Sequence, residues 1–366
     1  MKKGFYAVPA LLFLGADIML AAGVWKGEWL TPAVYLVIRI ALAAALLTCG
    51  LKAGKSEKDS GDPRLPGYWR TYLAGRLSDI QKRDMEIGNH GDSFIFITDL
   101  HYNANDGKSA AAAEYIMAGS SVGKVVIGGD ICNGSSRGKA VCVEQILKCR
   151  NAFRRLQPYY VRGNHDNNTE ISERSDDKTI SDSELYGMIL KPVEDRMIGC
   201  GNMHYYFHNE TQKIRYICLD TGHPDPYVID DAQIVWMQDR IRELETGWTA
   251  VILTHQYYSA AGEMDGNGEK ILAGLNAVCD EAKAVIACVI CGHSHADCLE
   301  MTEKGFPVIC TTCDARGGEA GTLKRRYHTH TEQAFDVFHI DTAARKIHIT
   351  RIGAGTDRQA SYGLQE

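Results

Sequence analysis

Two apolar runs, each about 20 residues long, open the chain. They span residues 4–25 and 30–51, and the only acidic or basic residues inside them are Asp17 and Arg39. Each run has about the length that a helix needs to cross a bilayer. Antiparallel helices would bring Asp17 and Arg39 to similar depth, where pairing lowers the cost of burying either charge. Residues 1–52 therefore predict a two-helix transmembrane hairpin.

The residues around these runs predict the orientation of the hairpin. Lysines lie before the first run and after the second, and lysine-rich flanks favour the cytoplasmic side. We therefore expect a cell-membrane protein whose main domain is cytoplasmic. Two alternatives are open: a cleaved signal peptide ending near residues 21–23, or a soluble helical hairpin packed on the domain. The second apolar run argues against a signal peptide, because a secreted enzyme would not need it.

Residues 53–92 differ in pattern from both neighbours. Residues 54–67 are polar and contain two prolines, which is typical of a linker. Apolar residues then recur at helical spacing, so an amphipathic helix is expected over residues 68–87.

Residues 93–352 combine short apolar runs with helical periodicities. Strands are expected at 94–98, 124–128, 159–162, 203–208, 214–220, 249–254, 285–291, 306–311, 334–341 and 346–351. Helices are expected at 109–118, 139–155, 183–196, 230–245 and 268–283. The early part alternates strand and helix, and the later part contains hairpins. This mixture predicts an α/β domain of two packed sheets with helices outside them. Residues 353–366 are expected to form a C-terminal tail.

Composition and charge limit the partners. The formal net charge is -6, so the molecule as a whole would not attract nucleic acid. Most of the 12 cysteines lie in apolar strand-like runs, where free cysteine behaves as a small core residue. This pattern favours a reducing compartment.

Five of the predicted strands end in residues that bind metals. The residues at these ends are Asp99 and His101, then Asp130, then Asn164, His165 and Asp166, then His255, and finally His293 and His295. Open α/β sheets place their sites at the carboxyl ends of strands. Packing histidines have no reason to recur in this way. Oxygen ligands mixed with imidazoles suit Mn, Fe or Zn better than Ca, which prefers oxygen alone.

These residues carry a resemblance to a known family. The chain resembles the calcineurin-like metallophosphoesterases, whose five blocks are present here in order: Asp99-x-His101, Gly129-Asp130, Gly163-Asn164-His165-Asp166, His255 and Gly292-His293-x-His295. The resemblance covers about residues 93–352. It implies a four-layer α/β/β/α sandwich, the metallo-dependent phosphatase fold, with two metals at the sheet ends.

The resemblance also implies a role for each residue. Asp99, His101 and His295 would hold one divalent metal, Asn164, His255 and His293 the other, and Asp130 would bridge them. Two cations about 4 Å apart can bind a bridging hydroxide and neutralise phosphate oxygens during in-line attack. His165 would then protonate the leaving oxygen, with Asp166 orienting its ring.

We therefore expect a membrane-tethered phosphoesterase that hydrolyses phosphodiester or phosphomonoester bonds. The segment after Asp130 lacks the arginine that protein phosphatases of this family carry, which argues against a phosphoprotein substrate. The expected substrate is a small phosphate ester, such as a nucleotide-like one, or a membrane lipid. The alternatives are a nuclease of the same fold and a non-catalytic membrane-anchored binding protein. Intact ligands in every block argue against the latter.

Overall fold

The computed structural model describes residues 62–102, 107–169, 177–199, 202–222, 224–225, 228–314 and 324–363. The predicted transmembrane hairpin, residues 1–52, lies outside these ranges. Within them, no helix combines the length and the apolar character that crossing a bilayer requires. The chain divides into two units at Pro63, and the unit from Arg64 onward contains all of the helices and strands below.

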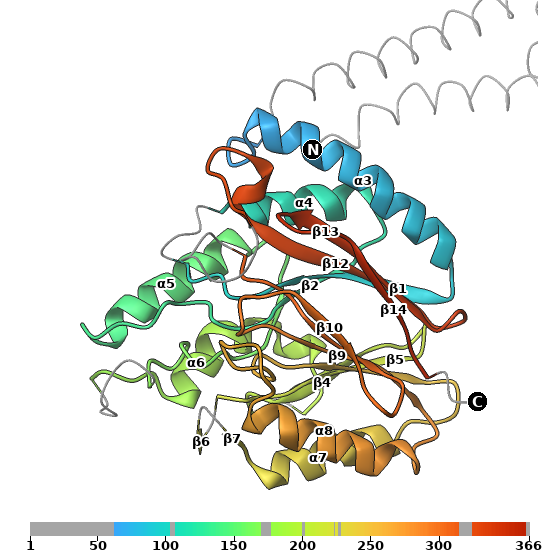
Figure 1. The fold of residues 1–366 in the computed structure, drawn as a ribbon. Helices are drawn as coiled ribbons and strands as arrows, with labels where there is room; N and C mark the ends of the chain where they lie inside the picture. The colour runs from blue at the N-terminus through green and yellow to red at the C-terminus, as the bar shows by residue number, and fades with distance from the viewer. Residues whose placement is uncertain are drawn as a thin grey trace, which may run out of the picture. The chain divides into compact units, whose positions relative to one another are not determined.

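The helices and strands follow one another along the second unit (Figure 1). The helices are α3 (Gly67–Ile87), α4 (Lys108–Gly119), α5 (Lys139–Ala152), α6 (Asp182–Ile189), α7 (Asp231–Arg242) and α8 (Gly266–Cys279), with short 3-10 helices η1 (Lys191–Arg196) and η2 (His330–Glu332). The strands are β1 (Gly91–Ile97), β2 (Lys124–Ile127), β3 (Tyr159–Tyr160), β4 (Tyr205–Asn209), β5 (Ile214–Cys218), β6 (Pro224–Asp225), β7 (Val228–Ile229), β8 (Thr249–Leu253), β9 (Val285–Cys291), β10 (Cys298–Met301), β11 (Pro307–Cys310), β12 (Ala334–Asp341), β13 (Lys346–Gly353) and β14 (Arg358–Ser361).

Two six-stranded mixed sheets form the centre of the fold. The strand order is β14-β13-β12-β1-β2-β3 in the first sheet and β10-β11-β9-β8-β5-β4 in the second. Helices α3 and α4 cover the outer face of the first sheet, and α7 and α8 cover that of the second (Figure 1). The sheets pack on each other through apolar side chains, as in the contact between Phe94 and Tyr216, whose rings lie 5.3 Å apart. The layers therefore follow the order α/β/β/α.

The central strands carry continuous apolar runs because both of their faces are covered. Every residue of β1 is buried, and so is every residue of β8. β1, β2 and β3 run parallel, as do β5, β8, β9 and β11. Parallel strands place their carboxyl ends at the same edge, so the metal-binding residue types collect there.

The structure differs from the prediction at several elements. The helix expected at 183–196 is split into α6 and η1, because Pro192 has no N–H for a continuing helix and stands in the first turn of η1. Strands β6, β7 and β10 were not expected. Part of the expected tail, residues 353–366, forms β14, an edge strand of polar sequence paired with β13.

Candidate metal centre

The loops after β1 and β2 hold two aspartates and a histidine in place through backbone pairing. The Asp99 amide donates to the Gly129 carbonyl at 3.0 Å, and the His101 amide donates to the Asp130 carbonyl at 2.9 Å. The parallel pairing of the two strands thus continues past their ends. This extension fixes the separation of the Asp99 and Asp130 side chains.

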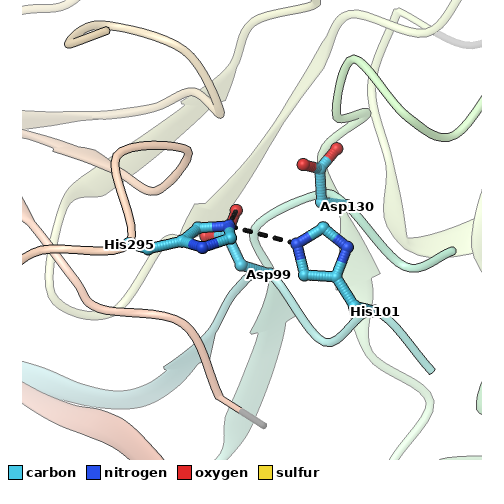
Figure 2. Close-up of side chains that lie close together, drawn as sticks. All are labelled: Asp99, His101, Asp130 and His295. Atoms are coloured by element: carbon cyan, nitrogen blue, oxygen red, sulfur yellow. Dashed lines mark hydrogen bonds and ion pairs between the residues drawn. The ribbon is translucent and has the colours of Figure 1, made fainter. Parts of the chain in front are cut away.

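One cluster joins these loops to the loop after β9. Ligand atoms of Asp99, His101, Asp130 and His295 all lie within 4.8 Å of one another. The Nε2 atoms of His101 and His295 lie 3.1 Å apart, and His295 Nε2 lies 3.3 Å from Asp99 Oδ1. Figure 2 shows the two imidazoles and two carboxylates close together, with a dashed line between the imidazoles.

A second cluster shares Asp130 with the first. Ligand atoms of Asp130, His255 and His293 lie within 4.8 Å of one another. His255 Nε2 is 3.3 Å from Asp130 Oδ2 and 3.1 Å from Asn164 Oδ1. All seven residues predicted as ligands thus lie at one edge of the two sheets.

These separations fit divalent cations. Ligands bound at about 2.0–2.1 Å to one ion and about 90–109° apart lie about 2.8–3.4 Å from each other. The His101–His295, His295–Asp99, His255–Asp130 and His255–Asn164 contacts all fall within that interval. Asp99 Oδ1 is also buried and receives no well-formed hydrogen bond from the described residues. The residues present therefore fit two cations that share Asp130.

Hydrogen bonds with neighbouring groups orient the ligand side chains toward this centre. The Nδ1 of His255 lies 2.8 Å from the Gly128 carbonyl, which assigns the proton to Nδ1 and leaves Nε2 for a metal. Asp99 Oδ2 accepts from the Thr98 hydroxyl at 2.8 Å and from the His293 amide at 3.1 Å. Thr98 directly precedes Asp99, but the motif pattern gave no reason to predict it as a site residue.

The pKa shifts of the residues at the centre indicate that it favours positive charge. Burial acts to lower the pKa of His255, but the carboxylates of Asp130 and Asp99 outweigh it and raise the pKa to about 10. Burial acts to raise the pKa of Asp130, but His255 and other imidazoles hold it well below its usual range. Buried carboxylates that draw protons onto neighbouring imidazoles offer a place for cations.

Backbone conformation also marks the centre. Within the described ranges, ten non-glycine residues have positive φ, and five of them are predicted ligands: Asp99, His101, Asp130, His293 and His295. This conformation costs on the order of 1–2 kcal/mol for each residue. Strain of this kind persists where the surrounding structure enforces it, and it gathers at functional sites.

The glycines of the motifs are required by close packing. A Cβ on Gly163 would lie 2.2 Å from Asp130 Oδ1, and one on Gly292 would lie 2.6 Å from Asp99 Oδ2. A Cβ on Gly129 would lie 2.5 Å from His255 Nδ1. These positions have no room for a side chain while the ligands keep their places.

His165 and Asp166 occupy different places from each other. His165 Nε2 lies 3.8 Å from Asp130 Oδ2, and the side chain is 22% exposed. Asp166 is fully buried and accepts backbone N–H groups of Ile131, Cys132 and Gly163 at 2.7, 3.2 and 2.8 Å. Both Asp166 oxygens thus bind backbone N–H groups, and the role of orienting the His165 ring stays a prediction. Asp166 joins the loops after β2 and β3 because it satisfies buried N–H groups of both.

A buried ion pair supports the loop after β3 from behind. Arg162 is fully buried, and its Nε lies 2.7 Å and its Nη2 2.5 Å from the two oxygens of Asp220. Arg162 directly precedes Gly163 and Asn164. This pair could not be predicted, because nothing in the sequence connects Asp220 to the motif.

Comparison with known proteins agrees with this geometry. The family model described as calcineurin-like phosphoesterase matches residues 93–297, more than half of the chain. The chain belongs to the calcineurin-like phosphoesterase family. The family match and the ligand set support divalent metals in this phosphoesterase. No curated protein matches the chain.

The chain is also similar to solved structures, and the first of those below has the same fold. A dimetal phosphatase from Danio rerio is 15% identical, with a TM-score of 0.54 over 74% of this chain and 99% of the other. A phosphatase from Mycoplasma pneumoniae is 14% identical, with a TM-score of 0.38 over 73% and 95% of the chains. The NAD nucleotidase of Haemophilus influenzae is 14% identical, with a TM-score of 0.40 over 74% and 49%.

Proposed function

We propose that this phosphoesterase hydrolyses phosphate esters at a dinuclear metal centre bridged by Asp130. The observation that carries the proposal is the membership of Asp130 in both ligand clusters. In this proposal Asp99, His101 and His295 complete one metal site, and Asn164, His255 and His293 complete the other. When bound, the two divalent ions supply Lewis-acid charge to phosphate oxygens and lower the pKa of water.

The chain's own residues position the reaction. His165 lies beside Asp130 and is partly exposed, so its ring can reach an ester oxygen and donate a proton to the leaving group. The His165 amide donates to Asp130 Oδ1 at 3.0 Å, which holds the base of the ring against the bridging carboxylate. Asp166 fixes the same loop through backbone groups, so we propose a positioning role for it.

Activity assays test the proposal. Purified full-length chain is assayed with Mn, Fe or Zn, and with a chelator, on p-nitrophenyl phosphate, its bis-ester, nucleotides and phospholipids. We expect hydrolysis that depends on metal, and a loss of about 10²–10⁴-fold in kcat for His165→Asn with two metals still bound. Hydrolysis that survives the chelator, or full activity of the His165→Asn variant, would contradict the mechanism.

We also propose that residues 1–52 tether the enzyme to the membrane, with the catalytic unit in the cytoplasm. Two apolar runs of bilayer length and the lysines at both flanks support this proposal. A tethered enzyme reaches substrates presented at a membrane surface, so phospholipids belong in the assay beside soluble esters. Equal activity on all soluble esters and none on lipids would restrict the substrate to small phosphate esters.

A further inference from the structure

We propose that a buried polar network beyond the family-matched region positions His295 and thereby sets the affinity of the metal site that His295 completes. The network consists of Asp297, Thr311, Thr312, Asp336, Arg351 and Arg358, and we call it the Arg351 network. Only Asp297 lies within residues 93–297, where it is the last residue that the family model matches. The inference rests on the proposed metal centre.

The network is hydrogen-bonded to the loop that carries His295. The Thr312 hydroxyl donates to the His295 carbonyl at 2.7 Å. The Thr312 amide donates to Asp297 Oδ1 at 3.1 Å. Thr312, which follows the end of β11, therefore holds this loop at two points, on either side of Ala296.

Arg351 connects the loop that carries His295 to the other sheet. Its Nη2 lies 2.5 Å from Asp297 Oδ1 and 3.1 Å from Asp336 Oδ2, and its Nε lies 2.8 Å from Asp336 Oδ1. Asp336 also accepts from Thr311 at 2.8 Å and from Arg358. Strands β12, β13 and β14 of the first sheet are thus bonded to the site loop and to β11 of the second.

Two properties of His295 make such support necessary. Its backbone has positive φ, at 57°, so the surroundings must enforce its conformation. Its side chain is 21% exposed, whereas the carboxylates of Asp99 and Asp130 are at most 2% exposed. Packing alone therefore restrains the His295 ring less than these two carboxylates, and the backbone contact from Thr312 restrains it further.

Burial makes a purely structural explanation weaker. Asp336 is fully buried and Arg351 is 1% exposed. Breaking a buried ion pair is costly, but replacing it with apolar residues often is not, so such pairs are poor stabilisers. In contrast, mutation of a residue that hydrogen-bonds to a metal ligand typically lowers metal affinity 10–100-fold. The C-terminal strands thus take part in building the metal centre.

The test uses Mn(II) binding to the full-length chain, stripped of metal and titrated by equilibrium dialysis. Thr312→Val keeps the side-chain shape and removes the donor to His295. We expect one of the two ions to bind about 10–100-fold more weakly and the other to bind as in the wild type. Thr312→Ser restores the hydroxyl and should restore both affinities.

A matched control is available in a turn between β10 and β11. The Thr302 hydroxyl donates to the Phe306 carbonyl at 2.7 Å, the same type of contact without a metal-binding residue. Thr302→Val should leave both Mn(II) affinities unchanged. If Thr312→Val does not fold, Asp297→Asn replaces it, because this change keeps the volume and weakens the bond to Arg351.

The outcomes separate the two proposals. Selective loss of one ion at an unchanged melting temperature supports the positioning role. Wild-type affinity for both ions in folded Thr312→Val, or in Asp297→Asn where that variant takes its place, overturns it while the proposed function stands. A wild-type chain that binds no Mn(II) overturns the metal centre itself, and the positioning role with it.

Discussion

At the scale of single residues, the centre depends on chain positions that accept unusual geometry. Aspartate and histidine enter the left-handed region more readily than most residues, and five of the seven predicted ligands lie there. The glycines beside them leave room for the carboxylates. Motifs that look short in the sequence therefore describe a tightly packed set of backbone turns.

Gly163 offers a test at this scale. In Gly163→Ala the added Cβ would lie 2.2 Å from both the backbone nitrogen and Oδ1 of Asp130, so the backbone and the carboxylate of Asp130 must move. We expect a destabilisation of about 1–3 kcal/mol and weaker binding of both metal ions. Urea unfolding and Mn(II) titration measure these effects.

Gly75 of α3 is the control for this substitution. A Cβ at Gly75 would have no atom within 4 Å, so Gly75→Ala should stabilise the helix by about 0.5–1 kcal/mol and leave metal binding intact. Metal binding by Gly163→Ala equal to that of Gly75→Ala would show that the packing around Asp130 is not required.

At the scale of elements, α3 is part of the catalytic unit. Its Trp69, Leu73 and Ile80 are buried in the core that the first sheet also lines. Asp84 of α3 accepts a hydrogen bond from the Ser93 hydroxyl at 2.8 Å, and it lies 3.4 Å from Nδ1 of the buried His339. The helix after the predicted linker is therefore fixed to the sheet by apolar and polar contacts together.

Asp84 predicts a pH dependence of stability. Burial acts to raise its pKa, but the His339, Ser121 and Ser93 contacts outweigh it and lower the pKa to about 2. An aspartate with a lowered pKa stabilises the folded chain above its unfolded pKa of about 4, and this stabilisation disappears as the pH falls through about 2. The wild type should thus exceed Asp84→Asn in stability most at neutral pH, and the difference should shrink toward pH 2.

Urea midpoints of the two proteins between pH 6 and pH 2 measure this difference. Asp79→Asn is the control, because Asp79 lies on α3 with its side chain 57% exposed. A gap between wild type and Asp84→Asn that stays constant with pH would rule out the proposed contribution of the ionised carboxylate.

At the scale of the whole molecule, the sequence allowed much of the fold and the site to be predicted. The strands that end at Asp99, Asp130, Asn164, His255 and His293 are apolar runs, so their burial and their common edge follow from pattern alone. β14 was missed because Arg358–Ser361 is a polar edge strand without an apolar face. The partners of Asp166 and Arg162 could not be predicted, because they depend on contacts between distant loops.

The proposed membrane tether belongs to this scale as well. We expect the full-length chain to remain in the membrane pellet after alkaline carbonate extraction, because two apolar helices of bilayer length resist release. Added protease should cut the catalytic unit in inverted vesicles and spare it in intact cells. Release by carbonate would argue against a spanning hairpin, and cutting in intact cells would reverse its orientation.

Anomalous diffraction from crystals of the full-length chain grown with Mn(II) tests the central claim most directly. We predict two peaks about 4 Å apart, both within bonding distance of the Asp130 carboxylate. One peak should also contact His101 and His295, and the other His255 and His293. The absence of any peak at Asp130, with Mn(II) bound elsewhere or not at all, would contradict a dinuclear phosphoesterase.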